Sequence, residues 1–182
     1  MCATALALFG PTAAGAAERT PTVKRVLEDA KKSKFRIYWA GDRVLGDPIT
    51  DAFVRTEPRT QTPTFTFIYG DCDGDACAPI EVQVYAACAR NLAIYERAPK
   101  ARRLHFHRTR IRRVPAITVR EETGAARIEI YTGRSTIVIF ATSGRRARRI
   151  AKRLASIDGR IQPRERFPRP AVGHLAGKVE CS

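Results

Sequence analysis

Four cysteines are the residues of this chain whose type and spacing carry the clearest chemistry. A fifth, Cys2, lies in an apolar opening stretch that ends in small residues resembling a signal-peptidase site. Removal of a leader at residues 1–17 would discard the odd thiol and leave an even number, as in exported proteins with two disulfides. The four remaining cysteines are Cys72, Cys77, Cys88 and Cys181.

The spacing of these cysteines favours structural disulfides. C-x4-C with a third cysteine eleven residues on fits no common zinc-ligand pattern, and the redox motif C-x-x-C is absent. Four cysteines allow three connectivities. One of them joins Cys72 to Cys77 across a short turn and Cys88 to Cys181 across a long loop, where the entropic model predicts the larger stabilisation, about 4 kcal/mol.

The even number of cysteines left after removal of a leader predicts a secreted or cell-envelope protein. The leader itself, however, departs from the usual pattern. No basic residue precedes Glu18, whereas a signal peptide begins with basic residues. Either translation starts upstream, or residues 1–17 are a flexible tail of a cytoplasmic protein. The cytoplasm is therefore the alternative location.

Two further clusters resemble metal sites but depart from the required patterns. Residues 71–77 alternate aspartates around a glycine, yet this glycine is at the fourth position of a calcium loop and Val82 occupies the twelfth. His105 and His107 would share one face of a strand, but the surrounding arginines repel a divalent ion. We therefore predict no metal site and no cofactor.

Catalytic motifs are absent as well. The chain has no nucleophile elbow, no HExxH and no phosphate loop, so we assign no catalytic residue. Polar residues at 69–71 and 131–135 lie where strands are expected to end, which is where active sites and ordinary turns both occur. A hydrolase of unrecognised type therefore remains the second alternative for function.

Charge is distributed unevenly along the chain. Residues 1–95 carry eleven basic and eleven acidic residues, whereas residues 96–182 carry twenty-two basic and seven acidic. The net charge of +15 therefore comes from the second half. Such asymmetry creates a positive surface that attracts polyanions and weakens in salt, although many basic faces are simply solvated.

The basic segments predict a polyanion-binding surface. Its partner would be an anionic cell-envelope polymer or an acidic lipid surface, and nucleic acid is the alternative. Only Phe106 is aromatic among the basic residues of 97–120, which gives little support for base stacking. The candidate residues are Arg102, Arg103, Arg110, Arg112, Arg113, Arg145, Arg146, Arg149, Lys152 and Arg153.

Periodicity and end signals predict two helices. Thr20 caps the first, about residues 21–32, in which Val23, Val26, Leu27 and Ala30 form one apolar stripe. Ser143 caps the second, which we expect to end near Gly159. Its apolar stripe comprises Ala147, Ile150, Ala151, Leu154 and Ile157.

Alternating apolar residues predict the strands. The clearest lie at 35–39, 64–69, 80–85, 116–120, 127–131 and 135–140, with weaker ones at 50–55 and 104–108. A turn or loop is expected at Asp47-Pro48 and a helical turn within 88–97. The short connections require antiparallel pairing. We therefore predict an α+β fold, an antiparallel sheet of about five to seven strands covered by one or two helices and stapled by disulfides.

Residues 35–155 contain short motifs: Tyr38-Trp39-Ala40-Gly41, Tyr69-Gly70-Asp71-Cys72, Arg90-Asn91 and Tyr131-Thr132-Gly133-Arg134-Ser135-Thr136. In these motifs the chain resembles a group of uncharacterised exported or envelope-associated proteins of actinobacteria. The resemblance implies export and a single domain but no activity. We expect this domain at 18–160, followed by an extended strap at 161–182.

Overall fold

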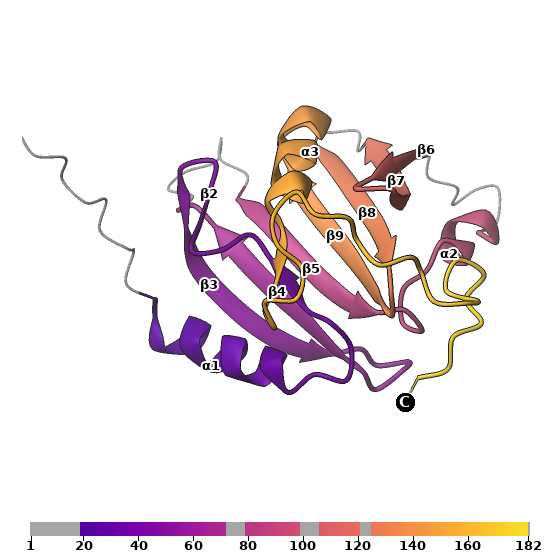
Figure 1. The fold of residues 1–182 in the computed structure, drawn as a ribbon, viewed down its shortest axis with the longest axis horizontal. Helices are drawn as coiled ribbons and strands as arrows, with labels where there is room; N and C mark the ends of the chain where they lie inside the picture. The colour runs from indigo at the N-terminus through magenta and orange to yellow at the C-terminus, as the bar shows by residue number, and fades with distance from the viewer. Residues whose placement is uncertain (1–18, 72–78, 99–105, 121–124, 182) are drawn as a thin grey trace, which may run out of the picture.

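The computed structural model describes residues 19–71, 79–98, 106–120 and 125–181. Most of the strands form one antiparallel sheet in the order β2-β3-β4-β5-β9-β8-β7-β6 (Figure 1). The sheet confirms the predicted α+β class and holds eight strands rather than five to seven. Their bounds are β2 Arg43–Val44, β3 Asp47–Thr56, β4 Pro63–Tyr69, β5 Ile80–Ala86, β6 Phe106–Ile111, β7 Val114–Arg120, β8 Ala126–Thr132 and β9 Ser135–Ala141.

Two runs of hairpins make up this sheet, and one long-range pairing joins them. Strands β2 to β5 form the first run and β6 to β9 the second, each with antiparallel neighbours in chain order. Strand β5 then pairs with β9, with Val84 opposite Ile137. Because this pairing brings the last strand of each run together, the apolar sides of both runs form one continuous surface.

Helices α1 (Pro21–Lys31) and α3 (Gly144–Arg153) cover that surface (Figure 1). The caps are as predicted: the Val23 amide donates to Thr20 Oγ1 over 3.3 Å, and the Arg146 amide donates to Ser143 Oγ over 3.3 Å. The apolar stripes of both helices are buried in one core with the isoleucines of β8 and β9. The helix starts set by the capping residues therefore place the apolar stripes so that they face the core.

On the other face of the sheet, a second layer of chain packs against β7 and β8. The short helix α2 (Ala93–Glu96) and the C-terminal strap lie against it. A second apolar cluster joins α2, the strap and the sheet there. Its members are Leu92, Tyr95, Ile117, Val119 and Tyr131, with Phe106 and Leu175 packed against them.

The prediction of a turn or loop at Asp47-Pro48 is wrong. These two residues begin β3, and the turn lies just before them at Leu45-Gly46, where both residues have positive φ. Val44 pairs with Asp47 and Arg43 with Pro48 around this turn. Two positive φ values suit a two-residue hairpin, and Gly46 adopts such a conformation without strain.

Helix α3 ends at Arg153, earlier than the predicted Gly159. Leu154 turns to extended geometry, with φ −59° and ψ 134°, and remains fully buried. The next two residues form β10 (Ala155–Ser156), which pairs with β1 (Tyr38–Trp39). This small sheet also shortens the strand expected at 35–39. Tertiary pairing therefore ends the helix before its sequence pattern does.

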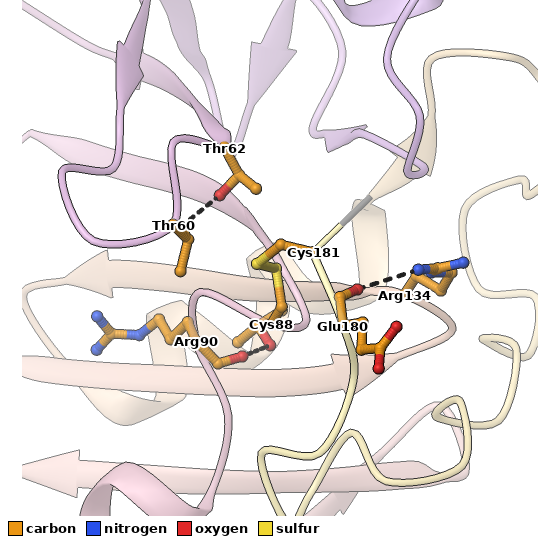
Figure 2. The surroundings of a disulfide bond; sticks show 8 residues. Thr60, Thr62, Cys88, Arg90, Arg134, Glu180 and Cys181 are labelled. Atoms are coloured by element: carbon orange, nitrogen blue, oxygen red, sulfur yellow. Dashed lines mark hydrogen bonds between the residues drawn. A yellow bond between two sulfur atoms is a disulfide. The ribbon is translucent and has the colours of Figure 1, made fainter.

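A disulfide joins Cys88, just after β5, to Cys181 at the end of the strap (Figure 2). This pair belongs to one of the predicted connectivities, whereas Cys72, Cys77 and the calcium-like loop apart from Asp71 lie outside the described residues. The strap has no helix or strand in its described part, residues 161–181. No helix among the described residues is long and apolar enough to cross a membrane.

Candidate anion-binding surfaces

The outer face of α3 carries a dense group of cations. Six of its ten residues are Arg or Lys and none is acidic. The buried stripe of Ala147, Ile150 and Ala151 fixes which side of the helix meets the sheet, so the remaining positions face solvent. The exposed cations that form no ion pair within the described part of the chain are Arg145, Arg148, Arg149, Lys152 and Arg153.

Arg146 differs from its neighbours on this helix. Its Nη2 lies 2.5 Å from Asp47 Oδ2 at the start of β3, and both side chains are about one-third exposed. The ion pair anchors the first turn of α3, where the helix dipole disfavours a positive charge. Arg146 therefore has its own counter-ion and is less available to an external anion than the exposed cations.

Arg112 is likewise engaged within the protein. Its guanidinium donates to the carbonyl of Leu154 over 2.6 Å, to that of Gln162 over 2.7 Å and to that of Glu165. It also stacks on the Phe167 ring, at 3.8 Å from the centroid. Three carbonyl acceptors and an aromatic face make Arg112 a clamp between the β6–β7 turn, α3 and the strap.

Arg110 and Arg113 lie on the sheet face opposite to α3. Arg110 pairs directly with Pro115, while the adjacent Val114 and Ala116 point into the core beneath α3. Both arginines are exposed. The predicted cations therefore do not form one surface, and Arg102 and Arg103 lie outside the described residues.

The structure also reveals a buried charge network that the sequence does not indicate. Glu129 on β8 is completely buried and accepts from Arg90 through two hydrogen bonds, 2.5 Å and 3.1 Å long. The Tyr95 hydroxyl donates to the same carboxylate, and Arg127 Nε lies 3.3 Å from it. In the sequence Glu129 occupies an ordinary alternating strand position, so no pattern distinguishes it from a solvated residue.

Electrostatics in this network follow from its burial. Desolvation opposes the Arg90 charge, but the hydrogen bond and charge of Glu129 outweigh it and raise the pKa of Arg90. Burial and the nearby carboxylate raise the pKa of Tyr95 to about 12. Arg90 is thus charged and Tyr95 neutral at pH 7. The Arg90 ion pair holds the segment before α2 on the sheet, and the Tyr95 hydroxyl attaches α2 itself to Glu129.

The polar residues at the β8–β9 turn anchor the strap. Thr132 Oγ1 donates to the carbonyl of Pro168 over 2.8 Å, and His174 lies within hydrogen-bonding distance of Thr136 and of the Gly133 carbonyl. The Ser135 hydroxyl donates to the carbonyl of Arg36 over 2.6 Å. The hydroxyl groups of Thr132, Ser135 and Thr136 therefore have partners within the fold.

His174 makes the stability of the fold depend on pH. Burial lowers the pKa of His174 to about 4, against about 6.5 in the unfolded chain. Because the unfolded state takes up the proton first, the free energy of unfolding should fall as pH drops from about 6.5 to about 4, by up to about 3 kcal/mol.

Urea denaturation of the wild type and of His174→Gln at pH 7, 5.5 and 4 measures this contribution. The variant lacks the titrating group, so its stability should change less over that range, and the difference between the two curves isolates His174 from the carboxylates. Parallel curves would contradict the assignment.

Among the described residues, no group of three or more His, Cys, Asp or Glu side chains could hold a metal ion. His107 is exposed on β6, and His105 lies outside the described part.

No protein-family model, curated protein or solved structure matches this chain. Its function is therefore inferred from its own side chains and their surroundings.

Proposed function

We propose that this protein is a non-enzymatic domain of the cell envelope or the extracellular space that binds an anionic envelope polymer through α3. The observation that carries the proposal is the group of five exposed cations on α3, which have no ion pair within the described residues. They line one helix without an intervening acid, so a repeating anion can contact several of them along its length.

The disulfide supports the proposed location. Cys88 and Cys181 are 93 residues apart, and such bonds persist in oxidising compartments rather than in the cytoplasm. Outside the cytoplasm, an acidic envelope polymer is a more accessible partner than nucleic acid. Alkylation of the native protein tests this step: we expect Cys88 and Cys181 to react only after reduction, and reaction without reductant would contradict it.

Binding is best measured with a defined polymer, poly(glycerol phosphate), over a range of salt concentrations. Each cation that contacts a phosphate releases counter-ions, so log affinity should fall linearly with log salt. Replacement of Arg145, Arg149 and Lys152 by Gln should weaken binding and reduce the slope by about 2–3, as expected for the loss of three contacts.

A charge-matched control separates the α3 face from net charge. Lys24, Arg25 and Arg59 are exposed and lie outside α3. Their replacement by Gln removes the same three charges and should leave the salt slope nearly unchanged. Equal effects of the two triple variants would overturn the proposal, and tighter binding of duplex DNA than of the envelope polymer would favour the nucleic-acid alternative.

A further inference from the structure

A groove of about 560 Å³ lies between the β6–β7 hairpin and the strap, on the sheet face opposite to α3. Its volume is within the range of small-molecule sites, about 300–1,000 Å³. Because no residue of α3 contributes to it, the inference drawn from it does not rest on the proposed function of α3. The lining residues are Arg110, Arg113, Pro115, Arg169, Pro170, Ala171, Gly173, Leu175 and Ala176.

The polar part of this groove is cationic. Three of its lining residues, Arg110, Arg113 and Arg169, are exposed arginines, and none of the lining residues is acidic. Within the described residues none of the three side chains has an ion pair. Guanidinium groups pair well with phosphate oxygens through two parallel hydrogen bonds, so the groove complements a phosphate-bearing ligand.

The rest of the groove is apolar, and an apolar side chain lies beside it. Pro115, Pro170 and Leu175 supply hydrocarbon surface between the arginines. Val172, which lies in the strap between two lining residues, is fully exposed, at 101% of its reference area. A single exposed valine is unremarkable by itself. Next to three cations, it matches a ligand that carries both phosphate and hydrocarbon.

Backbone hydrogen bonds hold the strap wall of the groove in place before any ligand binds. The Ala171 amide donates to the Gly133 carbonyl over 2.8 Å, and the Ala93 amide donates to the Leu175 carbonyl over 3.0 Å. On the other wall, Arg112 and Arg113 both have positive φ, 48° and 71°. This conformation is unfavourable for arginine, and it sends Arg112 to the α3 side while Arg113 lines the groove.

From these features we propose that the groove binds the headgroup of an acidic phospholipid at a membrane surface. The phosphate contacts Arg110, Arg113 and Arg169, while Val172 and the apolar lining contact the adjoining acyl chains. Charge complementarity selects an anionic headgroup, and the exposed valine favours a ligand embedded in a bilayer over a soluble phosphate.

Vesicle co-sedimentation tests this proposal with the full chain. The probe is phosphatidylcholine vesicles with or without phosphatidylglycerol, at physiological ionic strength. The variant Arg110→Gln, Arg113→Asn and Arg169→Gln removes the three charges, with Asn chosen because it tolerates positive φ. At about 1 kcal/mol for each cation near an acidic surface, binding should weaken about 100-fold.

Val172→Ser should weaken binding roughly tenfold, because a buried valine side chain is lost from the contact. Val54→Ser on β3 is its control, since Val54 is another exposed valine, at 39% of its reference area, and does not line the groove. The Lys24, Arg25 and Arg59 triple variant controls for net charge. Near-wild-type circular dichroism and melting temperature establish that each variant is folded.

Four outcomes would overturn the proposal. The first two are equal losses in the groove variant and the charge-matched control, and no effect of Val172→Ser. The third is release of vesicle-bound protein by millimolar glycerol phosphate, which would identify a soluble phosphate compound as the ligand. The fourth is loss of vesicle binding in the α3 variant alone, which would assign membrane contact to α3. None of these results decides whether α3 binds a polymer, so the two proposals fail separately.

Discussion

Replacement of Cys88 and Cys181 by Ser should lower the free energy of unfolding by about 4–5 kcal/mol. The disulfide closes a loop over a sequence separation of 93 residues, and the entropic gain from closing a loop increases with its length. Urea denaturation of the wild type and the double variant measures the difference, with a separate m-value fitted for each protein because the denatured chain without the disulfide exposes more surface.

The end of the strap near this bond also contacts the turn between β8 and β9. Arg134 Nη2, in the turn between β8 and β9, donates to the Glu180 carbonyl of the strap over 3.3 Å (Figure 2). Earlier in the strap, a Cβ on Gly177 would come within 2.8 Å of Asn91, so the close packing there depends on glycine. Loss of the disulfide should therefore free the end of the strap first.

Single variants provide the control for this prediction. Cys88→Ser alone breaks the bond, so it should lose nearly as much stability as the double variant. A single variant as stable as the wild type would show that the bond contributes nothing. Hydrogen exchange of the strap amides would show where the stability is lost, with the largest increase expected at 174–181.

Removal of the Glu129 carboxylate is the second prediction of large effect. Glu129→Gln keeps the shape of the side chain but leaves the largely buried Arg90 without its counter-ion. Breaking a buried pair from one side typically destabilises a protein by about 3–5 kcal/mol, because the remaining charge is uncompensated. Chemical denaturation should show a loss in that range.

Two further variants make this prediction specific to the buried pair. Glu28 forms an exposed ion pair with Lys31 on α1, so Glu28→Gln should leave stability unchanged within error. Replacing Arg90 and Glu129 together by Leu removes both charges and should recover much of the loss. If the double variant is as unstable as Glu129→Gln, the uncompensated charge of Arg90 does not account for the effect.

Local features of the sequence were sufficient for the class of fold and most of its elements. Thr20 and Ser143 cap helices where capping chemistry predicts, and the stripes of α1 and α3 are buried. Strands β4, β5, β7, β8 and β9 follow from two-residue alternation and short turns. These signals depend on neighbours a few residues apart, which the linear chain already places next to one another.

Only the tertiary structure decided which charged residues are available for binding. Arg112 and Arg113 are identical neighbours in the sequence, yet one contacts three carbonyl groups near α3 while the other lines the opposite groove. Arg146 meets Asp47 from 99 residues away, and Glu129 meets Arg90 from 39. The counter-ion of a side chain depends on which distant strands and loops pack next to it. Periodicity along the chain does not indicate which segments these are.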